Sequence, residues 1–406
     1  MNNILKIIST LLLIILAYFL VTNFFLAIKL PPAGGDSYWY HVPIAKNILN
    51  GNFIFQENIV QIEQWYPGAS EGILAIFIFL GLPVNLFNIL GILILSIVLY
   101  KFGYTYLNNK TLSLIFSLSL ATSYGIFRLA LSQNIDIWVA IYFLILLMLF
   151  EKPKNHDLYF LICGFFSGMF VGSKYAALLF FLVLLLVYGK RFIKNLNVKR
   201  ILLFLVPFTI FGLFWYIRNL VLTGSPFYPQ SILFFKGLPG WHSYLSVPIW
   251  GAFIKTPRLM LDAYISEFMI WPALFLVIPL FLIYVKKSNK NYNFLSQLKR
   301  ILTISVLFFL IYLFLPYDNL YLGMLLSVRY IYSIFILLAL TVFLIAQKFK
   351  AENILAVMLL TQTFVLFYQP YHPKLLFIYE PLVFGFILLI ICRTKLLKIL
   401  TKYIPL

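Results

Sequence analysis

The sequence predicts an all-α protein, a polytopic bundle of about twelve transmembrane helices. Two observations support this prediction. Hydrophobic residues make up 63% of the 406 residues and charged residues only 11%, with a mean hydropathy of +0.98, whereas soluble domains carry about 25% charged residues. Long apolar runs also recur along the chain, and no polar stretch is long enough for a separate soluble domain. We therefore expect one transmembrane domain over residues 1–406, placed in a cell membrane.

A helix that crosses a bilayer needs about 20 mostly apolar residues. Residues 4–28 are too long and too evenly apolar for a signal-peptide core, and no small-residue cleavage site follows, so we interpret them as an uncleaved first span. The expected spans are residues 4–28, 84–102, 111–127, 137–150, 158–173, 175–189, 201–217, 268–285, 300–315, 330–346, 353–369 and 377–393.

The apolar stretch at residues 71–83 is too short to cross a bilayer comfortably. If it were a span, the loop with Lys101 and Lys110 would move to the other side of the membrane. We therefore expect a juxtamembrane helix at residues 71–83.

A second short helix is expected earlier in the same loop. Pro43 fits the first turn of a helix, and Gly51 fits its end. The apolar residues between them share one face of this helix. They are Ile44, Ala45, Ile48 and Leu49. This pattern predicts that the helix lies on the membrane surface.

The formal charge of +19, from 31 Lys and Arg against 12 Asp and Glu, predicts an orientation. Basic residues concentrate in the cytoplasmic loops of membrane proteins. With a cytoplasmic N-terminus, most basic residues of this chain fall in inner loops and most acids fall outside. The charge therefore indicates contact with membrane lipids and not nucleic acid, and it places both termini in the cytoplasm.

Two long segments are expected on the extracytoplasmic side, residues 29–83 and residues 218–267. Shorter outer segments are expected near residues 128–136, 316–329 and 370–376. These segments carry most of the polar residues that can take part in chemistry. The active site is therefore expected outside the cytoplasm.

Asp36 directly follows the first apolar run, in the stretch Gly-Gly-Asp-Ser-Tyr-Trp-Tyr-His at residues 34–41. An isolated Asp at a membrane boundary is more often a helix cap or a structural hydrogen-bond acceptor than a catalyst. Here the following Tyr40 and His41 can stack on a sugar ring and donate hydrogen bonds. This context makes Asp36 the candidate catalytic residue.

The same outer face is expected to gather polar residues from distant segments. Lys174 separates two apolar segments of only about 15 residues each, and the cost of a cation in the membrane predicts a counter-ion. The simpler alternative is that Lys174 extends to the interface. The candidate substrate-binding residues are Tyr40, His41, Tyr66, Glu71, Asp136, Lys174, Tyr175, Arg218, Arg329 and Tyr330.

Several of these residues belong to a set of stretches that occur in a fixed order. The stretches are residues 35–43, 65–67, 134–136, 164–175, 215–219 with 224–229, and 329–330. Together they resemble the C-type fold (GT-C) of polytopic glycosyltransferases that use lipid-phosphate sugar donors. This superfamily includes the protein O-mannosyltransferases and the aminoarabinose transferases.

The resemblance implies that a sugar moves from a polyprenyl phosphate to an acceptor glycan, lipid or protein outside the cytoplasm. By the same resemblance, Asp36 is the base that activates the acceptor, Lys174 contacts the donor phosphate, and Arg329 lies near the cavity. Direct displacement by such a base predicts inversion at the anomeric carbon. The mannosyltransferases usually have Asp-Glu where this chain has Asp36-Ser37.

Physical chemistry agrees with these roles. A positioned base typically contributes about 10² to 10⁴ in rate. The departing phosphate gains negative charge as the glycosidic bond breaks, so Lys174, with Arg329 or Arg218, can stabilise it in a site of low dielectric constant.

A divalent metal is the alternative, because another branch of this fold holds one with paired acids. Asp36, Glu71 and Asp136 can in principle form such a site. Neither loop has the spacing D-x-D, however. We therefore favour a metal-independent reaction and expect no cofactor.

Two other classes of function stay open. A transporter or flippase for lipids or small molecules can also use Lys174 and Asp136, although the sequence shows no repeat of the kind that transporters contain. A catalytically inactive relative that acts as a scaffold subunit has the same sequence features. The enzyme hypothesis requires Asp36, Glu71, Asp136, Lys174 and Arg329 to line one extracytoplasmic cavity.

Overall fold

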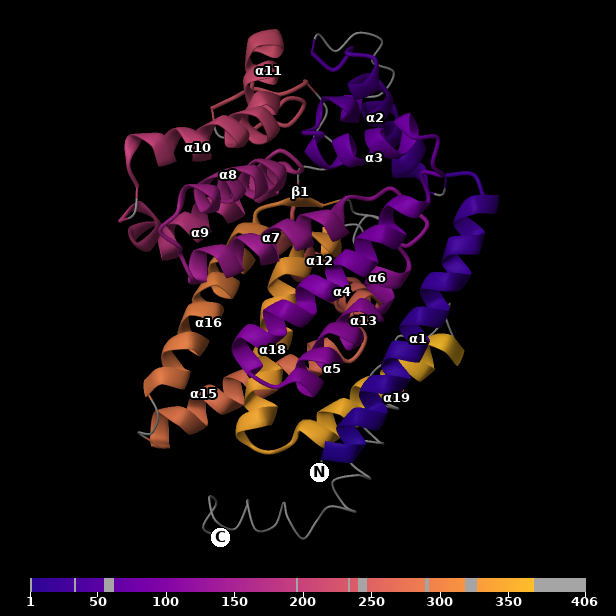
Figure 1. Cartoon of the computed structure of the whole chain (residues 1–406), viewed down its shortest axis with the longest axis vertical. Coiled ribbons are helices and arrows are strands. Elements are labelled where there is room, and N and C mark those ends of the chain that lie inside the picture. The colour runs from indigo at the N-terminus through magenta and orange to yellow at the C-terminus, as the bar shows by residue number, and fades with distance from the viewer. Residues whose placement is uncertain are drawn as a thin grey trace.

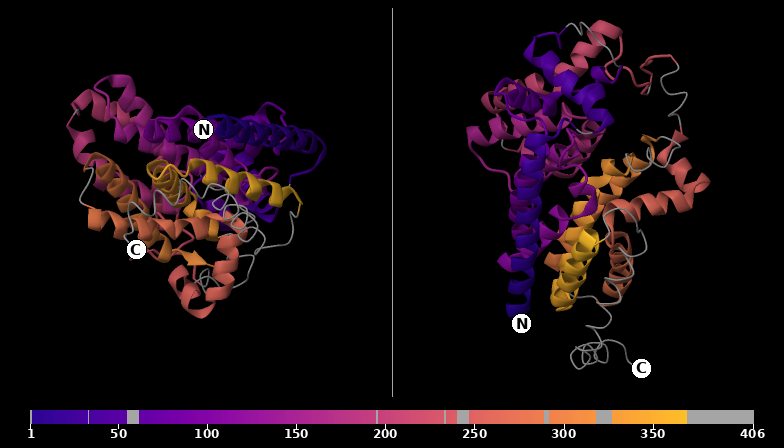
Figure 2. Two further views of the ribbon diagram at one scale, coloured as in Figure 1. Left: turned by 90° about the horizontal axis from the view of Figure 1, so that it is seen from below. Right: turned by 90° about the vertical axis from the view of Figure 1, so that its right-hand side faces the viewer.

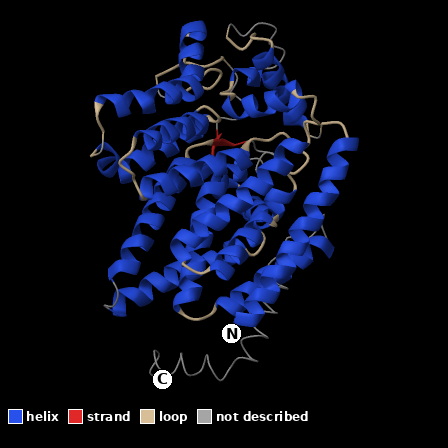
Figure 3. Cartoon of the chain, in the orientation of Figure 1, coloured by secondary structure: helices blue, strands red, loops and turns tan. Residues whose placement is uncertain are grey.

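The structure is a computed structural model that describes residues 2–32, 34–54, 62–194, 196–232, 234–239, 247–288, 292–317 and 327–368. Most of the described residues are helical (Figure 3), which confirms the predicted fold class. The strands among them form one antiparallel pair of two residues each, β1 at Val247–Pro248 and β2 at Pro316–Tyr317. The expected span at residues 377–393 lies outside the described residues.

Most of the helices follow one another along the chain with short connections (Figure 1). The described helices are α1 Asn2–Lys29, η1 Ser37–His41, α2 Val42–Leu49, η2 Ile62–Trp65, α3 Ala69–Phe79, α4 Leu86–Leu107, α5 Lys110–Ala121, α6 Tyr124–Phe127, α7 Asp136–Glu151, α8 Asp157–Val171, α9 Tyr175–Ile193, α10 Val198–Phe208, η3 Thr209–Leu213, α11 Phe214–Thr223, α12 Ile249–Lys255, α13 Pro257–Phe268, α14 Trp271–Phe275, α15 Val277–Ser288, α16 Tyr292–Leu313, η4 Arg329–Ile331, α18 Tyr332–Lys348 and α19 Glu352–Tyr368. Longer segments separate α11 from α12 and α16 from η4.

Six helical segments of the described chain are long and apolar enough to cross a bilayer. They are Asn3–Lys29, Leu86–Leu107, Tyr175–Ile193, Val198–Thr223, Ser296–Leu313 and Arg329–Lys348. A seventh candidate is the pair Pro257–Phe268 and Trp271–Tyr284, which is bent by 102° at its break. The chain is therefore an integral membrane protein. The larger number of about twelve spans stays a prediction.

Helices α2, α3 and α11 group at the end of the molecule opposite the N-terminus (Figure 1). Helix α1 runs along one side of the bundle and connects the two ends (Figure 2). The segment that carries Asp36 directly follows α1, so it lies at the end away from the N-terminus. If the N-terminus is cytoplasmic, this end is extracytoplasmic.

The two short helices of the first loop are present as predicted. Pro43 lies in the first turn of α2, and Gly51 follows this helix with a φ of 75°, a conformation that glycine adopts without strain. Helix α3 covers most of the predicted juxtamembrane stretch. Ile44 and Ala45 are buried, because α2 packs against α3. These two residues therefore face the protein, and the position of the helix on the membrane surface stays a prediction.

Helix α8 packs closely along α10 and η3 through its glycines. A Cβ atom added at Gly164 would overlap the carbonyl group of Phe204, and one added at Gly172 would overlap the carbonyl oxygen of Phe211. Small residues allow backbones to approach closely where membrane helices cross. This packing fixes the end of α8, which leads directly to Lys174.

The segment at residues 218–267 differs from the prediction. The prediction did not include helices there, but the structure forms α12 and α13, and α13 packs against α6 and α14. The extracytoplasmic position of this segment stays a prediction. Met260, Ala263 and Glu267 of α13 are fully buried. A helix of 12 residues with several polar side chains gives too weak a hydropathy signal to be recognised from hydropathy alone.

Candidate functional site

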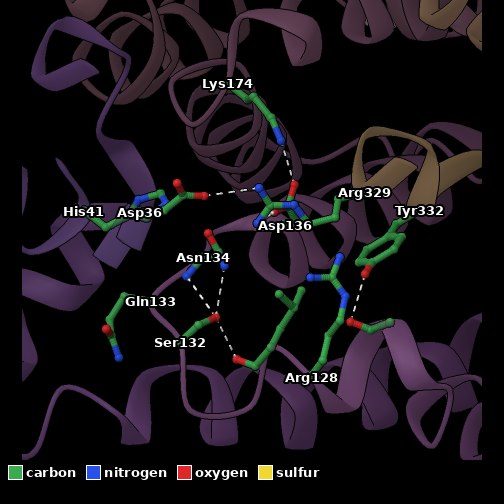
Figure 4. Close-up of polar contacts among 12 residues, drawn as sticks. Asp36, His41, Arg128, Ser132, Gln133, Asn134, Asp136, Lys174, Arg329 and Tyr332 are labelled. Atoms are coloured by element: carbon green, nitrogen blue, oxygen red, sulfur yellow. Dashed lines mark hydrogen bonds and ion pairs between the residues drawn. The ribbon is translucent and has the colours of Figure 1, made fainter. Parts of the chain in front are cut away.

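Four charged side chains from distant segments form one series of ion pairs (Figure 4). Arg329 Nη2 lies 3.2 Å from Asp36 Oδ2, and Arg329 Nη1 lies 3.4 Å from Asp136 Oδ2. Lys174 Nζ lies 2.6 Å from Asp136 Oδ1. We call Asp36, Arg329, Asp136 and Lys174, in this order, the ion-pair chain. It confirms that Lys174 has a counter-ion, which is Asp136.

The local structure explains why these residues meet. Asp36 directly precedes η1, Asp136 is the first residue of α7, Lys174 directly precedes α9, and Arg329 begins η4. All four side chains therefore start at helix ends. Because helix ends of a bundle gather in layers, residues far apart in the sequence can converge there.

Burial differs between the middle and the ends of the ion-pair chain. The side chains of Asp136 and Arg329 are 6% exposed, whereas those of Asp36 and Lys174 are 23% exposed. A buried charge is costly unless it is paired, so the two buried residues hold each other and the two end residues. Asp36 and Lys174 are therefore the members that a ligand can reach most easily.

Aromatic side chains border the ion-pair chain. Lys174 Nζ lies 3.9 Å from the centre of the Tyr330 ring, a cation–π contact. Burial raises the pKa of Tyr40 well above its usual value, and the nearby charge of Asp36 adds to this effect. The Tyr40 phenol therefore stays neutral and keeps its proton as a hydrogen-bond donor. The rings of Tyr40 and Tyr66 pack edge to face, with their centres 6.0 Å apart.

A small pocket lies beside these charges. Its polar lining comes from Asp136, Lys174, Arg329, Tyr330, Tyr332 and Ser333. Its remaining walls are mostly apolar side chains of α7 and α9. Polar groups that converge in an apolar recess are typical of a ligand site.

Glu71 and His41 lie apart from this pocket. His41 Nδ1 is 2.7 Å from Glu71 Oε1, and both side chains are 2% exposed. Helix α3 carries Glu71, and its neighbour Ser70 is hydrogen-bonded to Ser173 at 2.7 Å. We expected Glu71 to line the cavity with the other charged residues. The structure instead pairs it with His41 inside the protein.

Three further candidates, Tyr66, Tyr175 and Arg218, join a polar cluster between the first loop and α11. Arg218 Nη2 donates to the carbonyl oxygen of Trp65 at 2.8 Å. Asn219 Nδ2 contacts the same oxygen at 3.0 Å and the Tyr175 hydroxyl at 2.9 Å. These bonds fasten the first loop to two helices that follow much later in the chain.

Arg218 shows two further features. Its guanidinium lies 5.0 Å from the Trp215 ring. No carboxylate pairs with it within the described part of the chain.

The structure adds a second buried ion pair that the sequence did not indicate. Arg128 binds Glu267 with two nitrogens, at 2.8 Å and 2.9 Å, and Glu267 also accepts a hydrogen bond from the Tyr332 hydroxyl. The same hydroxyl is 2.9 Å from the carbonyl oxygen of Gly125. Tyr332 lies three residues after Arg329. This contact therefore fixes the helix end that carries Arg329.

Amide side chains hold the loop before Asp136. Gln133 Nε2 donates to Asn85 Oδ1 at 2.9 Å, and the Gln133 backbone N–H donates to the Ser37 hydroxyl at 3.1 Å. Asn88 Nδ2 donates to the carbonyl oxygen of Asn134 at 2.8 Å. Sequence reasoning missed Asn85, Asn88 and Gln133, because single Asn and Gln residues near helix ends carry no recognisable spacing.

No family model and no curated protein matches this chain. The crystal structure of ArnT from Cupriavidus metallidurans in the apo state is similar to it, with a TM-score of 0.54. The alignment covers 95% of this chain and 71% of that chain, at 12% sequence identity. The chain has the GT-C fold. This confirms the resemblance predicted from the sequence at the level of the fold.

The geometry of the site also bears on whether its carboxylates could hold a metal ion. Within the described residues no group of three or more His, Cys, Asp or Glu side chains is placed to hold a metal ion. Arg329 lies between Asp36 and Asp136 and contacts both carboxylates. A divalent ion shared by these acids would have to displace this guanidinium. Independence from metal stays a prediction.

Proposed function

We propose that this protein is a membrane glycosyltransferase. It moves a hexosyl or pentosyl group from a polyprenyl-phosphate donor to a hydroxyl of an acceptor glycan, lipid or protein on the extracytoplasmic side. Cell envelope glycosylation is the process that this reaction would serve. The observation that supports the proposal most is the ion-pair chain within the GT-C fold. It has a carboxylate that a ligand can reach, Asp36, at one end, and an ammonium group that a ligand can reach, Lys174, at the other.

Asp36 is the proposed general base. It takes the proton of the acceptor hydroxyl while the oxygen attacks the anomeric carbon of the donor sugar. The bond between this carbon and the phosphate oxygen breaks, and the phosphate leaves with the electron pair. Attack opposite the leaving group gives inversion. A base in this position contributes about 10² to 10⁴ in rate.

Lys174 is the proposed contact of the leaving phosphate. It lies at the other end of the ion-pair chain from Asp36, so the acceptor and the phosphate can be held on opposite sides of the reacting carbon. Charge-assisted hydrogen bonds from an ammonium group to phosphate are strong in a partly buried site. Arg329 adds positive charge between the two ends, and Asp136 keeps both cations in place.

The neighbouring aromatic residues suit a sugar substrate. Tyr40, Tyr66 and Tyr330 present ring faces and hydroxyl groups around the ion-pair chain, and neutral phenols donate hydrogen bonds without changing charge. The polyprenyl chain of the donor would lie in the bilayer beside the helices. The proposed reaction needs no metal, because Lys174 and Arg329 supply the positive charge.

A transporter or flippase is the second candidate, and one observation favours it. The pair Pro257–Phe268 and Trp271–Tyr284 is bent by 102° at its break, and the buried Glu267 lies next to the break. Broken helices with buried charges are common at the binding sites of transporters. The ion-pair chain, in contrast, lies at helix ends, which favours an enzyme.

Sugar transfer by the purified protein in lipid tests the proposal, with a panel of polyprenyl-phosphate sugars as donors. We expect the wild type to transfer from at least one donor, and Asp36→Asn to lose at least 100-fold of this rate, roughly the contribution of a general base. Asp157→Asn is the matched control, because Asp157 pairs with Lys199 and Arg200 at the opposite end of α8 from Lys174, and its side chain is 39% exposed.

The panel separates the alternatives. Loss of transfer with a chelator would show that the reaction uses a metal. Failure of the wild type with every donor would overturn the proposal and favour a transporter or an inactive scaffold subunit. Transport of a labelled lipid across proteoliposomes would then distinguish these two.

A further inference from the structure

We propose that Asn134 forms a subsite for a sugar hydroxyl next to the general base. Its side-chain oxygen accepts a hydrogen bond from a hydroxyl of the substrate ring and so helps to select the substrate. This inference rests on the proposed function and adds a specificity-determining residue to it.

The orientation of the Asn134 amide follows from its neighbours. The Ser132 hydroxyl donates its only hydrogen to the carbonyl oxygen of Leu129 at 3.0 Å. It can therefore only accept from Asn134, whose backbone nitrogen is 3.4 Å away and whose Nδ2 is 3.2 Å away. The opposite orientation would place two acceptor oxygens against each other. The amide nitrogen thus faces Ser132, and the oxygen faces the other way.

The Asn134 oxygen points toward the ion-pair chain (Figure 4). It has no hydrogen-bond partner among the described residues, although it is shielded from solvent. A buried acceptor without a partner costs about 1–3 kcal/mol. Such groups are rare in folded proteins and call for an explanation. A ligand that donates a hydrogen bond at this position provides one.

Two other amide oxygens in the same region also lack partners, but they do not fit a ligand. Gln133 Oε1 and Asn88 Oδ1 belong to residues with 0% exposure, which hold the loop from the inside. Asn134 is the half-buried member of the three. It is also two residues from Asp136, so its position is fixed relative to the site.

The chemistry of an amide oxygen suits a hydroxyl that does not react. A carboxylate can remove a proton, whereas a neutral amide accepts a hydrogen bond and leaves the proton in place. Asp36 pairs with Arg329 through Oδ2, so its Oδ1 is available for the reacting hydroxyl. Asn134 would then bind a different hydroxyl, on the transferred sugar or on the acceptor ring.

Occupation of this subsite requires a small movement of side chains, because the oxygen is shielded in the structure. Asp36 and Lys174 are the more exposed members of the ion-pair chain, at 23% each. We expect this movement to follow the entry of a substrate at these two side chains.

Monodeoxy substrates test the inference. The probes are the polyprenyl-phosphate sugar that supports transfer, its acceptor, and forms of each that lack one hydroxyl. We expect one deoxy form to lower the wild-type kcat/KM by roughly 3- to 10-fold, the effect of one neutral hydrogen bond. Asn134→Leu should lose this discrimination and treat that deoxy form and its parent alike. A donor analogue places the hydroxyl on the transferred sugar, and an acceptor analogue places it on the acceptor.

Two further variants control for folding. Ser132→Ala leaves Asn134 intact but removes the group that orients its amide, so it should weaken the same discrimination in part. Asn109→Ala removes the N-cap of α5, whose Oδ1 accepts a hydrogen bond from the Leu112 backbone N–H. Asn109 is not part of the proposed site. This variant should lower stability by about 1 kcal/mol and leave the choice of substrate unchanged.

The outcomes are distinguishable. The subsite is overturned, while the glycosyltransferase stands, if Asn134→Leu lowers kcat/KM by the same factor for the parent and for every deoxy form. It is overturned equally if this variant discriminates between them as well as the wild type does. A wild type that uses all deoxy forms as well as the parents overturns the subsite without any variant. Absence of transfer by the wild type overturns the proposed function, and the subsite with it.

Discussion

Replacement of Arg329 with Met should show what the ion-pair chain contributes to the fold. Arg329 contacts both Asp36 and Asp136, and its side chain is 6% exposed. Met keeps most of the volume but removes the charge. Breaking a buried ion pair by removing one partner costs about 3–5 kcal/mol. Asp36 is 23% exposed and regains water, whereas Asp136 keeps Lys174, so we expect the lower end of this range.

The dependence on pH gives this prediction a signature. Burial raises the pKa of Asp136, whereas Lys174 and Arg329 lower it. Without the guanidinium the effect of burial gains weight, and Asp136 takes up a proton more readily in the folded protein than in the unfolded one. Protons then bind preferentially to the folded variant. The difference in the free energy of unfolding between the wild type and Arg329→Met should therefore be smaller at pH 5 than at pH 8.

Chemical denaturation in mild detergent, followed by tryptophan fluorescence, measures these differences. Arg200→Met is the matched control, because Arg200 pairs with the 39% exposed Asp157, and such a pair contributes only about 0–1 kcal/mol. If Arg329 and Asp136 interact, the double variant with Asp136→Asn should lose less stability than the sum of the losses of the two single variants. Our reasoning is refuted if Arg329→Met is as stable as the wild type, or if the two single losses simply add.

Two other predictions concern the donor side of the site. Lys174→Met should lower the rate of sugar transfer by about 10²- to 10³-fold, the typical loss when one group that stabilises developing charge is removed. In the same transfer assay, Lys199→Met should show no such loss, because the Lys199 side chain is 73% exposed. Gly172→Ala should lower the stability by about 1–3 kcal/mol, because a Cβ there overlaps the carbonyl oxygen of Phe211. Gly189→Ala on α9, where a Cβ meets nothing within 4 Å, should be neutral or stabilising in the same denaturation experiment, and a Gly172→Ala variant as stable as Gly189→Ala would contradict the packing.

The fold class and the two short helices of the first loop could be predicted because they depend on local signals. Hydropathy marks membrane helices, and Pro43 and Gly51 mark the ends of α2. The counter-ion of Lys174 could be predicted in kind, since a cation in an apolar segment needs one. Its identity, Asp136, depends on how α7 and α9 pack, which no local pattern contains.

The remaining contacts could not be predicted for the same reason. Glu71 has the same charge and an equally promising place in the sequence as Asp36, but α3 turns it toward His41. Glu267 lies in a segment too polar to be recognised as part of the bundle, and its partner Arg128 is 139 residues away. Pairings over such distances are set by the three-dimensional arrangement of helix ends.

The ion-pair chain also couples two events that take place at its opposite ends. Asp136 divides its attraction between Lys174 and Arg329, and Arg329 divides its attraction between Asp136 and Asp36. An anion that draws Lys174 away leaves Asp136 with one cation, which it then holds more strongly. Arg329 consequently holds Asp36 less strongly. The Oδ2 atom of the proposed base would thus be released only after the donor phosphate has arrived, so an acceptor that came first would meet a carboxylate whose Oδ2 is still held by Arg329.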